Sequence, residues 1–165
     1  MSIHATAIID PRAEVDSSVQ IEPYVVVKGP VRIGANTRIG SHAVLSGRTT
    51  IGRDNLIGSF SSIGMPPQDL HYKGEPTEVI IGNGNQIREY VSIHRGTATG
   101  KGRTRIGNHC MIMSYCHIAH DCELGDHVIM ANLATLAGHV ELGDHTNLGG
   151  LVEVEIGRAS CRERV

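Results

Sequence analysis

The sequence predicts an all-β protein in which short strands follow one another around a triangular coil. Two regularities carry this prediction: aliphatic residues return at a spacing of six, and glycine or small residues keep step with them. No α-helix and no ordinary amphipathic strand has a period of six, so the repeat itself defines the architecture. These aliphatic residues, the anchor residues, are Ile3, Ile9, Val15, Ile21, Val27, Ile33, Ile39, Leu45, Ile51, Ile57, Ile63, Ile81, Ile87, Ile93, Ile106, Ile112, Ile118, Leu124, Met130, Leu136, Leu142, Leu148 and Val154.

The residues around each anchor also repeat. Glycine often follows directly, as in Gly34 and Gly52, and the side chain four residues after an anchor is small. We expect a short strand and then a bend in each unit, with Gly and Asn at the bends because they tolerate positive φ. Three units then close one coil, so residues 18 apart in the sequence stack on neighbouring coils about 4.8 Å apart. A narrow interior also fits the presence of one Phe and no Trp.

This pattern is that of hexapeptide-repeat proteins, and it resembles the left-handed parallel β-helix. The resemblance alone supplies the left hand, since parallel crossovers are generally right-handed. Two segments interrupt the count and are expected to leave the coil as loops, Met65–Val79 and Arg95–Arg105. Loops on a rigid scaffold often carry binding residues. The expected fold is therefore all-β, a left-handed parallel β-helix of hexapeptide repeats with two extruded loops.

Composition and charge narrow the class of protein. The net charge is −2 with 19% charged residues, and no basic patch with interleaved aromatic residues points to nucleic acid. No apolar run is long enough for a membrane span, and Met1–Pro11 has no signal-peptide core. We expect one soluble, cytoplasmic domain with no nucleic acid among its partners and no membrane span.

Three cysteines occupy the small inward position of successive units: Cys110, Cys116 and Cys122. Successive units lie on different faces of the coil, which disfavours both a disulfide and a zinc site. We expect reduced thiols packed in the core.

The last segment departs from the repeat. The anchor due after Val154 is Ser160, and Glu155–Val165 carries three Arg and a lone Cys161. This segment also matches, residue for residue, a translation of a common short-read sequencing adapter. We expect a β-helix domain over residues 1–154 that is truncated at its C-terminus, and a non-native tail over residues 155–165. The truncated chain is expected to lack activity.

One group of histidines keeps the 18-residue spacing. His109, His127 and His145 lie in near-identical turns and should form a column along one corner of the coil. Such a column could bind a metal ion, but a repeated turn with solvent-facing imidazoles explains it as well. We expect no metal site.

A second group of polar residues converges across two coils. The 18-residue rule places His120 beside Gly138 and Asp121 beside His139, with His117 close by. Because Ile118 and Cys122 point inward, we expect these polar side chains on or near the surface. They supply a candidate base, a group to orient it and an amide donor for developing negative charge. Spacing alone leaves catalysis and plain surface histidines both open.

Several motifs, in this order and spacing, resemble one family. It is the bacterial acyl-[acyl-carrier-protein]–UDP-N-acetylglucosamine O-acyltransferases, which catalyse the first step of lipid A biosynthesis. The resemblance implies transfer of a 3-hydroxyacyl group from acyl carrier protein to the 3-hydroxyl of UDP-N-acetylglucosamine, by a homotrimer with sites between subunits. The motifs are Pro67-Gln68-Asp69-Leu70, Ile93-His94-Arg95-Gly96-Thr97, His117-Ile118-Ala119-His120-Asp121-Cys122 and Leu136-Ala137-Gly138-His139-Val140.

The resemblance also implies three catalytic residues. His120 matches the family's general base, and Asp121 matches the carboxylate that fixes its imidazole tautomer. Gly138 matches the glycine whose amide receives the oxyanion. No metal and no cofactor are implied, since cleavage of the thioester supplies the driving force.

The substrate-binding residues follow from the same resemblance. Asp69 matches the loop residue that holds sugar hydroxyls, and His117 and His139 match histidines that line the site. His71 stands where the family usually has Lys, so its contact to the substrate is expected to be weaker.

Three other functions compete with this interpretation. A γ-class carbonic anhydrase would need a different histidine spacing and loop pattern. The related lipid A N-acyltransferase normally has an additional N-terminal domain and lacks the Gln-Asp-Leu loop. A non-catalytic β-helix that binds or scaffolds a partner also fits a chain without the family's C-terminal part.

Overall fold

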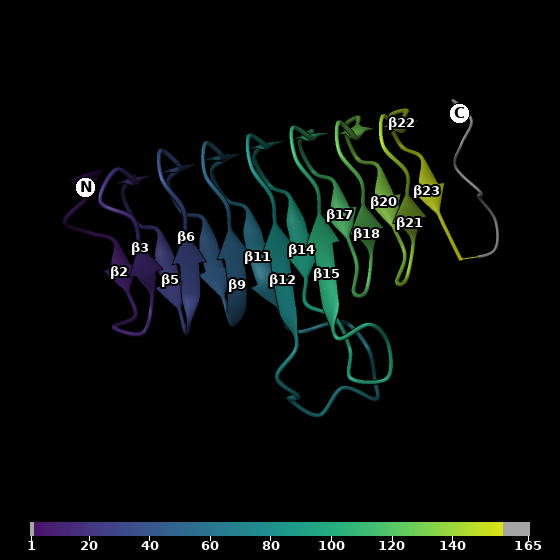
Figure 1. Cartoon of the computed structure of the whole chain (residues 1–165), viewed down its shortest axis with the longest axis horizontal. Coiled ribbons are helices and arrows are strands. Elements are labelled where there is room, and N and C mark those ends of the chain that lie inside the picture. Colours follow the sequence, from purple (N-terminus) through teal and green to yellow (C-terminus); the bar gives the residue numbers. More distant parts are fainter. Residues whose placement is uncertain (1, 157–165) are drawn as a thin grey trace.

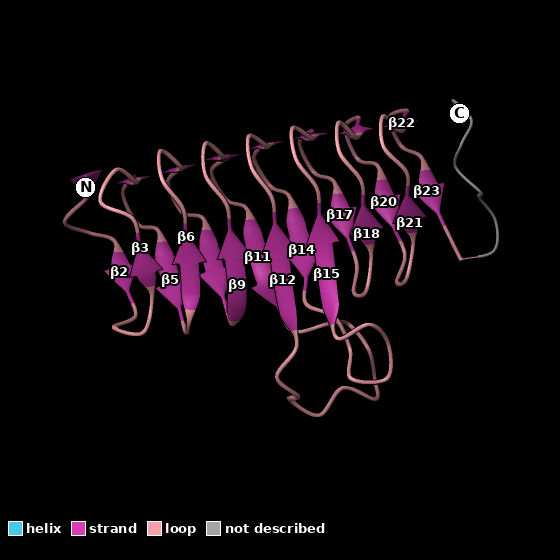
Figure 2. Cartoon of the chain, viewed as in Figure 1, coloured by secondary structure: helices cyan, strands magenta, loops and turns pink. Residues whose placement is uncertain are grey.

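The computed structural model describes residues 2–156, which form one stack of triangular coils whose parallel strands make three faces (Figure 1). Every regular element within these residues is a strand, joined to the next by a turn or loop (Figure 2). Residues 157–165, most of the segment expected to be a non-native tail, lie outside the described residues. No helix in the described part of the chain is long and apolar enough to cross a membrane.

The strands are distributed over three parallel sheets, each taking every third strand. The first sheet contains β1 (Ser2–Ile3), β4 (Gln20–Ile21), β7 (Arg38–Ile39), β10 (Leu56–Ile57), β13 (Gln86–Ile87), β16 (Met111–Ile112), β19 (Ile129–Met130) and β22 (Asn147–Leu148). The second contains β2 (Ile8–Ile9), β5 (Val26–Lys28), β8 (Val44–Ser46), β11 (Ser62–Met65), β14 (Ser92–His94), β17 (His117–Ile118), β20 (Thr135–Leu136) and β23 (Glu153–Val154). The third contains β3 (Glu14–Val15), β6 (Val31–Ile33), β9 (Arg48–Ile51), β12 (Glu78–Ile81), β15 (Arg103–Ile106), β18 (Glu123–Leu124) and β21 (Glu141–Leu142).

The register confirms the 18-residue rule. Ile3 pairs with Ile21, and His117 pairs with Thr135, in strands of neighbouring coils. The separation grows only where a loop intervenes, as between Ile57 and Ile87. Each anchor residue therefore stacks on the anchor of the next coil.

The anchor residues form the core, as predicted. From Ile21 to Val154 they are at most 4% exposed, whereas Ile3 is 36% exposed because its coil has a described neighbour on one side only. Cys110, Cys116 and Cys122 are buried and free, which confirms the prediction of core thiols. Burial raises the pKa of the Cys122 thiol to about 12.

The corners of the coil are built differently from the prediction. Positive φ falls on the third residue after an anchor, and this residue is often not Gly or Asn; Tyr90, for example, has φ 60° and donates its N–H to the Ser59 carbonyl of the preceding coil. Gly34, directly after an anchor, serves close approach instead: a Cβ there would lie 2.7 Å from the Gly52 carbonyl carbon. Inter-coil hydrogen bonds thus hold bulky residues in a conformation that usually favours glycine.

Both loops leave the coil at the same edge, below β12 and β15 in Figure 1. They are shorter than predicted and span residues 66–77 and 95–102. Met65 belongs to β11, and Val79 in β12 is fully buried and pairs with Thr104 of β15. The ends of both predicted loop segments therefore belong to paired strands, although the six-residue count is interrupted there.

Candidate active site

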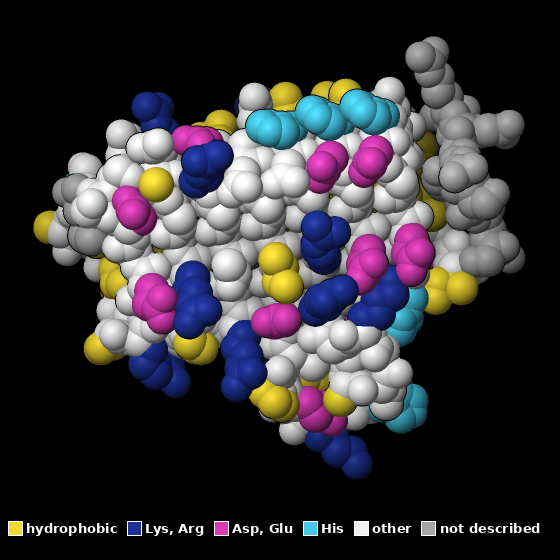
Figure 3. All heavy atoms as spheres, viewed as in Figure 1, with side chains coloured by type: hydrophobic (Ala, Val, Ile, Leu, Met, Phe, Trp, Pro, Cys, Tyr) yellow, Lys and Arg dark blue, Asp and Glu magenta, His cyan; other side chains and the backbone are white. Residues whose placement is uncertain are grey.

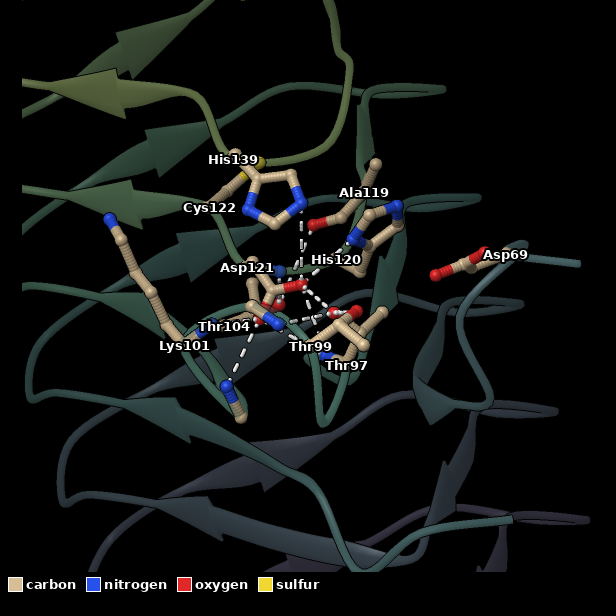
Figure 4. Close-up of polar contacts among 12 residues, drawn as sticks. Asp69, Thr97, Thr99, Lys101, Thr104, Ala119, His120, Asp121, Cys122 and His139 are labelled. Atoms are coloured by element: carbon tan, nitrogen blue, oxygen red, sulfur yellow. Dashed lines mark hydrogen bonds and ion pairs between the residues drawn. The ribbon is translucent and has the colours of Figure 1, made fainter. Parts of the chain in front are cut away.

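The site centres on Asp121, at the corner that follows β17. Its side chain is fully buried, so the expectation that Asp121 lies on or near the surface is wrong. The loop 95–102 folds over the carboxylate and donates hydrogen bonds from the N–H and Oγ1 of Thr97 at 3.0 and 2.7 Å and from the Lys101 N–H at 2.8 Å (Figure 4). Burial works to raise the pKa of Asp121, but the hydrogen bonds from Thr97 and His120 outweigh it and the pKa is lowered.

His120 is paired with this carboxylate. Its Nδ1 lies 2.8 Å from Asp121 Oδ2, and its side chain is 17% exposed. A neutral ring in this position donates its Nδ1–H to the carboxylate, which leaves the lone pair of Nε2 free to accept a proton. The arrangement is that of a base held by an acidic residue.

Gly138 lies against the His120 ring, as the 18-residue rule predicted. A Cβ on Gly138 would lie 2.7 Å from His120 Nε2, so any residue other than glycine would displace the His120 ring. Within residues 2–156, no hydrogen bond uses the Gly138 N–H. This backbone donor is therefore available close to the base.

His139 is also where the register placed it. Its Nε2 is 3.8 Å from Asp121 Oδ2, and its ring meets that of His120 edge to face with centroids 5.1 Å apart. Two imidazoles thus share one buried carboxylate. Together they form a possible metal-ligand set, with ligand atoms within 4.8 Å of one another. Both Asp121 oxygens already accept loop N–H groups, however, which favours a hydrogen-bonded network over a metal centre.

His117 and His94 form an adjoining pair. His117 Nδ1 is 2.7 Å from Ser92 Oγ, and the two imidazole rings meet edge to face at 4.8 Å. Burial lowers the pKa of His117. For His94, burial, with the nearby His117 and His120, lowers the pKa to about 4, so this ring is neutral at pH 7.

Sequence reasoning gave His94 no role. Its side chain is buried and its Nδ1 has no partner among the described residues. The available signal was its place directly after the anchor Ile93, whose strand pairs with that of His117. Thr97 was missed as well, because nothing in the period shows where a loop folds back.

Asp69 reaches the site from the longer loop and lies on the side of the His120 ring away from Asp121 (Figure 4). The N–H of His71 donates to Asp69 Oδ1 at 2.9 Å, and this hydrogen bond lowers the pKa of the carboxyl. The His71 side chain is 87% exposed, and its Nδ1 lies 3.2 Å from the same oxygen. His71 therefore supports Asp69 from the outer side of the loop.

The remaining histidine group forms the predicted column. The rings of His109 and His127 stack at 5.3 Å, and those of His127 and His145 at 4.8 Å. A row of histidine side chains follows this corner at the upper edge of Figure 3. In the part of the chain that the structure describes, these three do not bring their ligand atoms together as a metal-binding group.

Known proteins share both the repeat and the site region. The model of the bacterial transferase hexapeptide family (six repeats) matches residues 12–47 and 103–138. An acyl-[acyl-carrier-protein]–UDP-N-acetylglucosamine O-acyltransferase from Thermodesulfovibrio yellowstonii is 55% identical over 122 residues, which are 74% of this chain and 47% of the relative. The Neisseria meningitidis serogroup C protein of the same name is 58% identical over 120 residues, 73% of this chain and 46% of its own length.

Solved structures agree. The UDP-N-acetylglucosamine O-acyltransferase of Moraxella catarrhalis superposes with a TM-score of 0.93 at 47% identity, over 94% of this chain and 60% of that one. Fold and repeats together define a hexapeptide-repeat protein built as a left-handed parallel β-helix. Within that class, the chain belongs to the acyl-[acyl-carrier-protein]–UDP-N-acetylglucosamine O-acyltransferase family. The chain spans about half the length of the curated relatives that it matches.

Proposed function

We propose that the protein transfers a 3-hydroxyacyl group from acyl carrier protein to the 3-hydroxyl of UDP-N-acetylglucosamine, the first step of lipid A biosynthesis. The names of the relatives support the two substrates. The observation that carries the chemistry is the pair formed by His120 and the buried Asp121, with the Gly138 N–H beside it. In this proposal, the segment 1–154 belongs to the catalytic domain.

In the proposed reaction, His120 Nε2 takes the proton of the sugar 3-hydroxyl as its oxygen attacks the thioester carbonyl. A C–O bond forms and the carbonyl becomes an oxyanion, which accepts a hydrogen bond from the Gly138 N–H. The C–S bond then breaks, and the departing thiolate takes the proton from the imidazolium. Asp121 holds the required tautomer and stabilises the imidazolium.

These groups account for large rate effects. A positioned base contributes roughly 10²–10⁴-fold and one oxyanion donor roughly 10²–10³-fold. The proposed step uses no metal or cofactor, because thioester cleavage drives it.

Four further residues bind the substrates in this proposal. The Asp69 carboxylate accepts hydrogen bonds from sugar hydroxyls, and His71 holds that carboxylate in place. His117 and His139 line the space beside the base.

The proposal includes a homotrimer with its sites between subunits. An exposed aromatic corner supports assembly: Tyr24, Phe60, Tyr90 and Tyr115 are between 44% and 56% exposed, and with His42, which stacks between Tyr24 and Phe60, they form one row. Burying such a row against another copy is favourable. A mass of one chain in sedimentation equilibrium would contradict the trimer.

The proposed location is the cytoplasm, supported by core cysteines that form no disulfide and tested by cell fractionation.

The function is tested by following transfer from 3-hydroxyacyl-acyl carrier protein to UDP-N-acetylglucosamine. The full-length protein should catalyse it, and His120→Ala in that protein should reduce turnover roughly 10²–10⁴-fold. The matched control is His127→Ala, a histidine of the column that should leave turnover unchanged. Undiminished turnover by His120→Ala would rule out this base, and a lack of transfer by the full-length protein would contradict the function.

A further inference from the structure

Arg95 connects the two loops to the coil. It is the first residue after β14, and its backbone N–H donates to the Met65 carbonyl at 3.0 Å. Its guanidinium donates hydrogen bonds to two acceptors. Nη1 donates to the Gly64 carbonyl at 2.8 Å, and Nη2 donates to the Tyr72 hydroxyl at 2.9 Å. One side chain thus joins the end of β11 to the middle of the loop 66–77.

The coil leaves room for this side chain. Gly47, at φ 65°, faces the guanidinium so closely that a Cβ there would collide with Nη1. Among the described residues, Arg95 has no acidic partner, and its buried Nε has no hydrogen-bond partner. Leaving a buried donor unpaired is unfavourable. A role in simple ion pairing therefore does not explain this arginine.

Tyr72 connects Arg95 to Asp69, the proposed substrate-binding residue. The Tyr72 hydroxyl donates to the Glu75 carbonyl at 2.8 Å, and the Tyr72 N–H donates to the Asp69 carbonyl at 3.1 Å. The guanidinium carbon also lies 5.9 Å from the centre of the Tyr72 ring. The turn that carries Asp69 is thus held at Tyr72 by the Arg95 guanidinium.

We propose that Arg95 is a positioning residue, which holds the loop 66–77 through Tyr72 and so sets the place of the Asp69 carboxylate relative to His120. Arginine suits this role because its planar fork serves two acceptors at once, which a lysine ammonium on a flexible stem does not reproduce. The consequence for sugar binding rests on the proposed function of Asp69.

The first test follows amide hydrogen exchange and needs no activity. Arg95→Lys and Tyr72→Phe should each speed exchange of peptides covering residues 69–77 about tenfold, while peptides from β11 and β14 keep their wild-type rates. Arg32→Ala is the control, because this exposed arginine pairs with Glu14 far from the loops. Wild-type exchange of the loop in both variants would overturn the proposal, as would equal loss of protection throughout the coil.

The second test is a double-mutant cycle on the KM for UDP-N-acetylglucosamine. Arg95→Lys should raise this KM about tenfold with a smaller change in kcat. Combined with Asp69→Ala, it should add little to the effect of Asp69→Ala alone. Independent, multiplying effects would overturn the positioning role. If the full-length protein neither binds nor acylates the sugar nucleotide, the proposed function fails, and the exchange experiment still decides whether Arg95 holds the loop.

Discussion

Two histidine groups of this chain lie on the same 18-residue repeat and differ in chemistry: His109, His127 and His145 are 18 apart, whereas in the site the residues 18 apart are Asp121 and His139. In the column, the rings of His127 and His145 are stacked, with centroids 4.8 Å apart and an interplanar angle of 1°. In the site, the rings of His120 and His139 stand at 89° to each other and both approach Asp121. The repeat alone produces parallel rows, in which side chains stack without converging.

The difference lies in the loop beside the site. Asp121 is enclosed because the loop 95–102 closes over it, whereas Asp126 lies at an uninterrupted corner and accepts the Asn108 N–H at 2.7 Å. Burial strengthens the electrostatic interactions of the enclosed carboxylate. The loop at a break in the repeat thus encloses the carboxylate that orients the base.

The largest expected effect comes from Asp121→Asn. The amide leaves one oxygen to accept the loop donors and no longer favours the required imidazole tautomer. Turnover should fall roughly 10³–10⁴-fold, as for the corresponding change in serine proteases, and the free energy of unfolding by about 2 to 4 kcal/mol. Turnover assays and urea denaturation measure the two effects.

Asp126→Asn is the matched control for that variant. Its carboxylate belongs to a partly exposed turn, so stability should change by less than about 0.5 kcal/mol and turnover should be unchanged. Equal losses in both variants would show that enclosure by the loop makes no difference.

A smaller effect is expected from Gly138→Ala. The added methyl group would displace the His120 ring, and a shift of about 1 Å costs roughly 10²-fold in turnover. Gly143→Ala is the control, because a Cβ there meets nothing within 4 Å. Wild-type turnover of Gly138→Ala would place the reacting atoms elsewhere.

The smallest effect concerns pH. Burial lowers the pKa of His94 to about 4 in the folded protein, below the ordinary value of about 6.5. Between these values the unfolded chain binds more protons, so stability falls as pH decreases from about 6.5 to 4. Replacing His94 with Gln should remove on the order of 1 kcal/mol of this decrease. Denaturation curves across that pH range measure it, and an identical slope in the variant would contradict a buried neutral ring.

The period of six predicted the coil, its core and its register from the sequence. It also placed Gly138 beside His120 and His139 beside Asp121, because strict stacking converts sequence distance into spatial neighbours. It did not predict the burial of Asp121 or the place of Thr97, since the loop that brings them together is where the period stops. The bends were misjudged for another reason: inter-coil hydrogen bonds hold residues such as Tyr90 at positive φ, which local preferences do not reveal.

The two loops also bear on how the chain folds. Partners on adjacent coils are normally 18 residues apart, and the loops raise this to 30 between Asn55 and Asn85 and 25 between Asn85 and Cys110. Because the entropy of chain closure grows only with the logarithm of length, these insertions add about 0.5 and 0.3 kcal/mol to closing their coils. Each coil contacts only its neighbours, so folding can propagate past an insertion without a change of register. Chain-closure entropy therefore places little limit on which coil of such a repeat can carry a site.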